Sequence, residues 1–264
     1  MKQPIPLTPE DVGILIRCPL HYHFAQQKLA LATDEMRAEQ ALDRLTRETI
    51  FQLHAAGGPG RMSLDDCLAK AENRPLARQM IETYYRRLER DWPRVIAVNE
   101  TMTLRIFISR VSLVLGGTVD RLDTTRDGGL LAILIRTGPG PLPTPTDLRE
   151  NPAMTIYHAL VATTYPLKRP VRMQELWLRL NQEVTIELSE EEYRHNLSYL
   201  REPVQALARG EVRARPGLHC DVCPYKYQGC PVYAHDPEAE TGADDFEPPA
   251  SGGKIPPRQW IFKI

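Results

Sequence analysis

The sequence has no apolar run long enough to cross a membrane. No stretch approaches the roughly 18 consecutive apolar residues of a spanning helix. The opening residues, MKQPIPLTPEDV, also lack the basic-then-apolar layout of a secretory signal. We therefore expect a protein of the cytoplasm that makes no contact with membranes.

Cysteine is scarce: the chain has five cysteines among 264 residues. In a reducing cytoplasm, so few cysteines argue against a framework of disulfide bonds. Cysteines that cluster along the sequence therefore indicate a metal centre or catalysis.

The chain also lacks an excess of charge of one sign, since its formal net charge is −1. Residues 236–264 hold six of the 34 acidic residues and three of the 33 basic ones, so residues 1–235 carry about +2. This mild positive charge permits DNA contact without demanding it. Residues 236–264 lose apolar periodicity and gain Asp, Glu, Pro and Gly, which predicts an acidic, flexible tail after a domain at 1–235.

The remaining pattern predicts a mixed α/β fold, with a mixed sheet flanked by helices and a helical N-terminal part. Residues 57–60 (GGPG) lack the Gly-Lys-Ser/Thr ending of a phosphate loop and are typical of a turn between helices. Helical spacing and capping residues predict helices at 8–30, 35–55, 63–91, 148–165 and 189–208. Apolar and β-branched runs predict strands, the first four as an antiparallel meander, at 103–109, 111–115, 119–123, 130–135, 172–180 and 183–188.

Three cysteines near the end of the predicted domain have the spacing of a metal site. Cys220, Cys223 and Cys230 form C-x2-C-x6-C, which lets two thiolates reach one centre from a single turn and returns a third. Cys18 is the best candidate for the fourth ligand, because Cys67 lies inside a predicted helix and has the character of a small buried residue. The spacing alone leaves both an iron–sulfur cluster and zinc open.

Family likeness separates these two metals. Residues 7–9 (LTP) and 16–24 (IRCPLHYHF), the strand 117–123 (GTVDRLD) and the helix 148–165 resemble the RecB-like, AddB-type iron–sulfur nucleases of the PD-(D/E)XK superfamily, which include CRISPR-associated RecB-like exonucleases. The resemblance runs from about residue 7 to residue 233. It implies a restriction-endonuclease-like core with a C-terminal cluster loop, and a 4Fe-4S cluster on the four cysteines that joins the two ends of the domain.

The catalytic residues of that family are largely replaced. Where the family has Asp-Tyr-Lys-Thr-Gly at a strand end, this chain has Leu134-Ile135-Arg136-Thr137-Gly138. The family's Gly-x-x-x-His helix motif aligns with residues 43–47, so Arg47 stands in place of the metal-binding histidine. Its Gln-x-x-x-Tyr motif becomes Ala153 to Tyr157. Of the family positions, Asp120 and Tyr157 are retained.

These substitutions remove what phosphodiester hydrolysis requires. The reaction needs Mg2+ or Mn2+ on hard oxygen ligands, and Leu134 supplies none. Arg136 cannot replace lysine as a base, because a guanidinium does not deprotonate in proteins. We therefore expect neither Mg2+ nor Mn2+ at this site. Arg47 and Arg136 are instead expected to hold the phosphates of DNA.

Three functional hypotheses follow. The first is a pseudo-nuclease that binds DNA, including single strands, or a nuclease or helicase partner in a DNA repair, DNA-processing or CRISPR defence complex. The second is an active metal-dependent nuclease with relocated acids, for which Glu100, Asp123 and Asp127 are candidates. The third is an iron–sulfur redox sensor.

Overall fold

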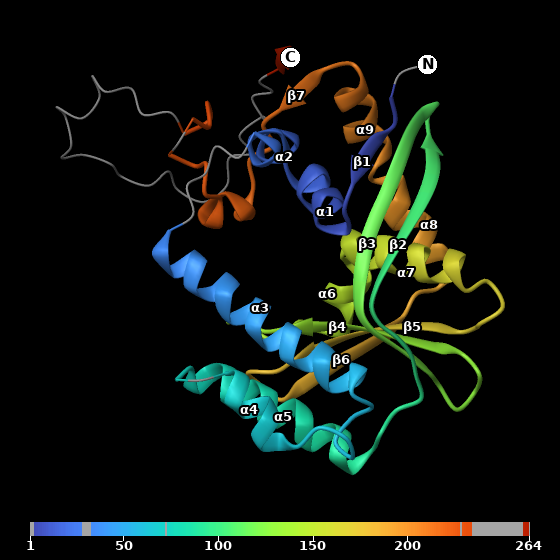
Figure 1. The fold of residues 1–264 in the computed structure, drawn as a ribbon. Coiled ribbons are helices and arrows are strands. Elements are labelled where there is room, and N and C mark those ends of the chain that lie inside the picture. Colours follow the sequence, from blue (N-terminus) through green and yellow to red (C-terminus); the bar gives the residue numbers. More distant parts are fainter. Residues whose placement is uncertain (1–2, 28–32, 72, 228, 234–260, 264) are drawn as a thin grey trace.

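The computed structural model describes residues 3–27, 33–71, 73–227, 229–233 and 261–263. The predicted tail therefore lies outside the described residues, apart from 261–263. Residues 261–263 form a short strand that pairs antiparallel with residues 211–213. The structure is shown in Figure 1.

The described chain alternates helices and strands as its sequence pattern predicts. Its α-helices are α1 (Pro9–Arg17), α2 (Pro19–Gln26), α3 (Asp34–Ala55), α4 (Leu64–Lys70), α5 (Pro75–Arg90), α6 (Pro145–Glu150), α7 (Pro152–Thr164), α8 (Glu190–Ser198) and α9 (Arg201–Ala208), with a 3-10 turn at Leu218–Val222. Its strands are β1 (Ile5–Leu7), β2 (Val95–Ile108), β3 (Val111–Thr124), β4 (Leu130–Arg136), β5 (Val171–Trp177), β6 (Gln182–Glu187), β7 (Glu211–Arg213) and β8 (Ile261–Lys263).

Four of the predicted helices are each two helices. The breaks fall near Pro19, Pro75, Pro152 and Pro203. Proline has no backbone N–H and disfavours the helical conformation in the residue before it, so a helix tends to end there and a new one begins. The first break matters most, because Cys18 is extended (φ −155°, ψ 104°) at the junction of α1 and α2. Cys18 therefore lies between the two helices and belongs to neither of them.

The main sheet is mixed, as expected. β2, β3 and β4 form an antiparallel meander of three strands, because the two strands predicted at 111–115 and 119–123 are one continuous strand, β3. β4 pairs with β5 in parallel, and β5 pairs with β6 antiparallel. β1, which the sequence pattern missed, pairs in parallel with β3 at residues 113–115. β3 pairs with β4 only from residue 121 onward, so it changes its neighbour on that side from β1 to β4. Figure 1 shows the β2–β3 hairpin reaching well beyond β4–β6.

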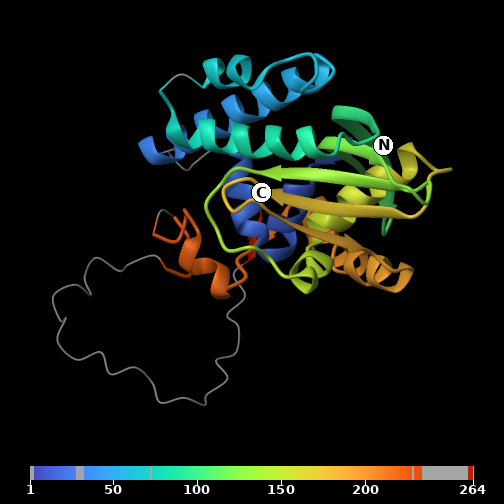
Figure 2. The ribbon, with the colours of Figure 1, turned by 90° about the horizontal axis from the view of Figure 1, so that it is seen from below.

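Helices cover both faces of β4 and β5, as Figure 2 shows from below. On one face, α3, α4 and α5 bury a core that includes Ile133 and Ile135. On the other face, α1, α6 and α7 bury a core that includes Leu134. Successive side chains of β4 therefore pack in the cores on opposite faces of the sheet, because side chains alternate between the two faces of a strand. The side chain at position 134 is directed to the α1 and α7 side.

Candidate functional site

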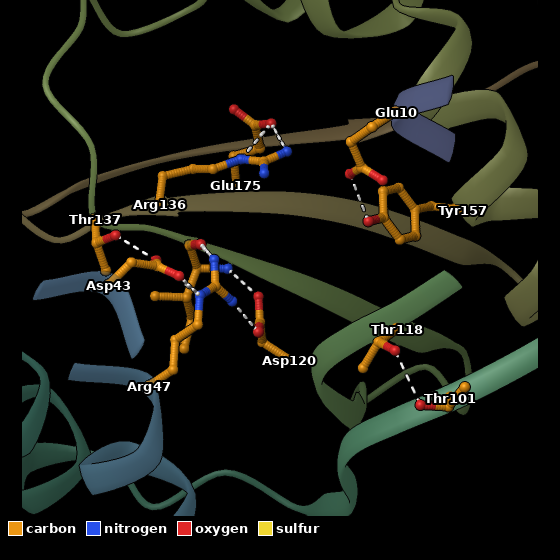
Figure 3. A network of polar contacts seen from close by, with 11 residues as sticks. Glu10, Asp43, Arg47, Thr101, Thr118, Asp120, Arg136, Thr137, Tyr157 and Glu175 are labelled. Carbon is orange, nitrogen blue, oxygen red and sulfur yellow. Dashed lines mark hydrogen bonds and ion pairs between the residues drawn. The ribbon is translucent and has the colours of Figure 1, made fainter. Parts of the chain in front are cut away.

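Asp120 lies on β3 at the point where that strand leaves β1 and joins β4. Its side chain is 7% exposed. One carboxylate oxygen accepts a hydrogen bond from the amide of Ile135 at 2.6 Å, and the other accepts from the Arg47 guanidinium. Both oxygens of Asp120 are thus already hydrogen-bonded inside the protein. Figure 3 shows this arrangement.

Arg47 reaches this position from α3. Its Nε donates to both oxygens of Asp43, at 2.8 and 3.0 Å, its Nη1 donates to Asp120, and its Nη2 donates to the Ile135 carbonyl. Asp43 precedes Arg47 by four residues and therefore lies on the same face of the helix. The Thr137 hydroxyl also donates to Asp43. All three guanidinium nitrogens are used, and the group joins α3 to the ends of β3 and β4.

The protonation of Asp120 depends on two opposing effects. Burial raises the pKa of Asp120, whereas the charge and hydrogen bond of Arg47 and the Ile135 amide lower it. The net direction is upward, because removal of the carboxylate from water is the larger effect. Arg47 is therefore the main group that lowers the pKa of this buried acid.

Arg136 is also paired with an acid. It donates from Nε and Nη2 to one oxygen of Glu175 on β5, at 2.9 and 2.6 Å. The other Glu175 oxygen accepts from the Trp177 indole at 3.0 Å. Glu175 is the register partner of Leu134, so an acid stands beside the position at which the resemblance implies a lost acid. Glu175 is buried.

Tyr157 on α7 donates a hydrogen bond to Glu10 on α1 at 2.7 Å. Burial and the Glu10 carboxylate raise the pKa of Tyr157, while the charge of Arg136 lowers it. Tyr157 is therefore a neutral phenol that joins α1 to α7. Ala153 lies one turn earlier on α7, and its amide donates to the Asn151 side chain that caps the helix.

The acids proposed as relocated ligands do not gather around Asp120. Asp123 accepts from Arg121 at 2.9 Å, and Glu100 accepts from Tyr165 at 3.4 Å. Asp127, in the β3–β4 turn, pairs with Arg172 on β5 at 2.7 Å. Within the described part of the chain, no group of three or more His, Cys, Asp or Glu side chains is arranged to hold a metal ion. The oxygen donors present do not fit Mg2+ or Mn2+ as they stand.

The four cysteines of the predicted cluster line one small cavity, of about 20 Å³. Cys18 comes from the α1–α2 junction, Cys220 and Cys223 from the 3-10 turn and its end, and Cys230 from the following loop. Burial raises the pKa of the Cys223 thiol, and the other three thiols raise it further. Four sulfur donors with no carboxylate among the lining residues suit iron or zinc. Their present arrangement is not that of closed metal ligation.

Cys67 lies apart from this cavity, as its helical position predicts. It is fully buried on α4 and belongs to the core beneath α3 and α5. Burial raises the pKa of its thiol.

Sequence reasoning missed Glu175 and Glu10. Glu175 stands in the run Val171–Trp177, where apolar residues surround it, and a charged residue inside a buried strand normally has a partner. The position of Glu175 within this apolar strand could therefore have identified it as a buried, paired acid. Nothing in the sequence marked Glu10, because an acid in the first turn of a helix is common for reasons of capping alone.

The chain is similar to a known protein family and to solved structures. The family model of the PD-(D/E)XK nuclease superfamily matches residues 6–230. Two solved structures are similar: SSO0001, at 13% identity over 89% of this chain and 90% of that one with a TM-score of 0.47, and a candidate exonuclease from Eubacterium rectale, at 12% identity over 83% and 87% with a TM-score of 0.48. No curated protein matches the chain. No helix within the described residues is long and apolar enough to span a membrane.

The match covers more than half of the chain, and the mixed sheet between helical layers agrees with the restriction-endonuclease-like fold of that superfamily. The chain belongs to the PD-(D/E)XK nuclease superfamily.

Proposed function

We propose that this chain is a RecB-like pseudo-nuclease that binds DNA, or a nuclease or helicase partner, without cutting DNA. The observation that carries the proposal is the pairing of Arg47 with Asp120. In a metal-dependent nuclease this carboxylate must be available to the cation. Here the Arg47 guanidinium is bound to the Asp120 carboxylate, and a second bond from Arg47 to Asp43 holds the guanidinium in position.

The second acid is missing at the same place. Leu134 is 2% exposed and packs in the core between the sheet and α7, so it offers neither charge nor oxygen. Arg136 cannot accept a proton from water. A divalent cation would have to displace a guanidinium from Asp120 and find its remaining ligands elsewhere.

DNA binding at this site depends mainly on Arg136. Arg47 uses all three of its nitrogens internally, whereas Arg136 leaves Nη1 without a hydrogen bond to any described residue. The Arg136 side chain is 30% exposed. A guanidinium that is oriented by a carboxylate and still presents free N–H groups suits a phosphate oxygen. We therefore assign the phosphate contact to Arg136 first and to Arg47 second.

We further propose that the cysteine cavity holds a 4Fe-4S cluster, with zinc as the alternative. The donor set supports this, since four thiols from the two ends of the domain line one cavity. When bound, such a cluster supplies cross-linking between α1–α2 and the C-terminal loop. The proposal predicts brown protein after anaerobic purification, with about four irons per chain. Colourless protein with one tightly bound zinc would contradict it.

A nuclease assay tests the loss of activity. Purified wild-type protein should bind labelled DNA at low salt, where phosphate contacts are strongest, and leave it intact with Mg2+ or Mn2+. The triple variant Arg47→His, Leu134→Asp, Arg136→Lys restores the family residues and is expected to gain weak Mn2+-dependent cleavage. Each single change should be silent, because catalytic groups acting as a unit are strongly non-additive. The matched control adds Asp120→Ala to the triple variant and should abolish the gained cleavage.

One observation favours the rival hypothesis of an active nuclease. Glu175 is the register partner of Leu134 and is a candidate relocated acid that the sequence pattern did not identify. Under that hypothesis wild-type protein cleaves DNA, and both Asp120→Ala and Glu175→Gln abolish the cleavage. That result would overturn the pseudo-nuclease proposal.

A further inference from the structure

The β2–β3 hairpin has one face packed in the core and one face left open. The core face carries Met102, Leu104 and Ile106 on β2 with Leu113 and Leu115 on β3. The open face carries four directly opposed pairs, at Thr101 and Thr118, Thr103 and Gly116, Arg105 and Val114, and Phe107 and Ser112. Each β2 member of these pairs is exposed, and each β3 member is half-buried. The open face begins two residues from Asp120, and Figure 3 shows its first pair, Thr101 and Thr118.

Phe107 is an unusual residue on this open face. Its side chain is 70% exposed near the tip of the hairpin. A phenyl ring held on a strand and open to solvent can stack on an unpaired base, and such stacking tolerates any base because every base has a π-face. Stacking on a base would explain a ring that the fold itself leaves unburied.

The charge of the open face also favours a polyanion. Arg105 lies on it beside Phe107, and none of its eight residues is acidic. The tip adds Arg110, which is exposed and has φ 69°, next to Ser109 at φ 49°. This left-handed conformation favours Gly or Asn in a two-residue hairpin turn, so an arginine here costs stability. Among the described residues, neither Arg105 nor Arg110 has an acidic partner.

We propose that the open face of the β2–β3 hairpin is a track for a single polynucleotide strand, with Phe107 stacking on a base and Arg105 and Arg110 contacting phosphates. The small residues Thr103 and Gly116 leave room for the sugar–phosphate chain between the site and the tip. From Thr118 to Ser112 the track spans about 20 Å at the rise of a β-strand. It continues directly from the Asp120 site, so the inference rests on the proposed function and extends it to a defined path.

Fluorescence anisotropy with a fluorescein-labelled oligothymidine tests the track. The probe should be on the order of 15 nucleotides, within the site sizes of stacking surfaces. Phe107→Ala should weaken binding about tenfold, as expected for loss of one base–aromatic stack. Phe107→Tyr keeps the ring and should bind like wild type. Arg105→Gln should lower the slope of log Kd against log salt by about one, as expected for one lost phosphate contact.

Two control variants change similar residues away from the track. Leu167→Ala removes a side chain that is 95% exposed in the α7–β5 connection, and Arg126→Gln removes an exposed arginine in the β3–β4 turn. Both should bind like wild type. Thermal unfolding of Phe107→Ala should match wild type, because the ring is exposed. Duplex DNA should bind more weakly than the single strand, since its bases are not open to stacking. Oligouridine binding with the same loss in Phe107→Ala would support the track with RNA as its ligand.

The possible failures are distinguishable. If wild type binds oligothymidine and both Phe107→Ala and Arg105→Gln bind it as tightly as wild type, the track is wrong. DNA then binds at another surface of the protein, and the proposed function is unaffected. If wild type binds no single strand, duplex or RNA at low salt, the DNA half of the proposed function fails, and the track fails with it. Loss of a protein partner in the Phe107→Ala variant, without any nucleic-acid binding by wild type, would reassign the face to protein recognition and overturn the inference.

Discussion

At the scale of single residues, the site is held together by two arginine–carboxylate pairs. Arg47 satisfies Asp120, and Arg136 satisfies Glu175. A buried carboxylate left without a partner costs several kcal/mol, so these pairs are needed for stability once the acids are buried. Arg47 and Arg136 therefore stabilise the fold by neutralising two buried acids. This is a structural reason for the pairs besides any contact with DNA.

The first prediction concerns Arg47→Met, which keeps the length of the side chain and removes its charge. Asp120 loses its main counter-charge, so the free energy of unfolding at neutral pH should fall by about 2 to 3 kcal/mol. Without Arg47 the pKa of Asp120 should rise further above that of the unfolded chain. Protonation then favours the folded state, so the deficit should shrink as the pH is lowered through that raised pKa.

Urea unfolding of wild type and Arg47→Met between neutral and mildly acidic pH measures this effect. Arg194→Met is the matched control, since Arg194 is exposed and pairs with Glu190 on the same helix. Its effect should stay within about 0.5 kcal/mol. A deficit for Arg47→Met that does not change with pH would show that Arg47 acts through packing and not through the charge of Asp120.

At the scale of elements, β3 is the strand that connects β1, β2 and β4 in the main sheet. It pairs with β2 along its length, with β1 near its start and with β4 at its end, and it carries Asp120 where the neighbour changes. Its two glycines, Gly116 and Gly117, point to opposite faces. A Cβ on Gly117 would lie 2.9 Å from Pro9 and 3.0 Å from Leu160, whereas a Cβ on Gly116 would meet only Thr103, at 3.9 Å. Only Gly117 permits close packing of α1 and α7 on the strand.

The second prediction compares alanine at these two neighbouring positions. Gly117→Ala should destabilise the protein by about 1 to 3 kcal/mol, because α1 and α7 must shift to admit the methyl group. Gly116→Ala adds the same methyl group on the open face and should stay within about 0.5 kcal/mol of wild type. Chemical denaturation of both variants measures the difference. Equal effects would mean that strand propensity, not packing against α1 and α7, decides the outcome.

At the scale of the whole molecule, the two ends of the domain meet at the cysteine cavity. Cys18 follows α1, while Cys220, Cys223 and Cys230 lie about 200 residues later, and all four line the same space. Apolar packing of Leu20 with Val212 and Ala214 brings these segments together. A cluster bound there would add its binding free energy to the stability of the whole domain.

The third prediction concerns the ligands from the two ends. Cys18→Ala and Cys223→Ala should each lose the bound iron and lower the melting temperature of the anaerobically purified protein by similar, large amounts. Cys67→Ala should keep the iron and cost only about 1 kcal/mol for the lost buried sulfur. Iron analysis and thermal unfolding check this together. Mild and equal effects in all three variants would remove the argument that a cluster joins the two ends.

Much of the fold could be predicted from local sequence patterns. The capping pairs of Thr8 with Asp11 and of Ser189 with Glu192 are formed, and both mark helix starts that the sequence predicted. Local patterns did less well at the prolines, where continuous apolar periodicity hid the breaks in four helices. They also missed β1, since three residues carry too little pattern to separate a strand from a loop.

The sequence by itself determined the family, the apolar identity of residue Leu134 and the spacing of Cys220, Cys223 and Cys230, because each depends on residue identity or on short separations along the chain. Only the tertiary structure decided what Arg47 and Arg136 contact. Arg47 and Asp120 are 73 residues apart, and Arg136 and Glu175 are 39 apart. Such pairs form because sheet register and helix packing bring distant side chains within hydrogen-bonding distance, and no local pattern specifies that geometry.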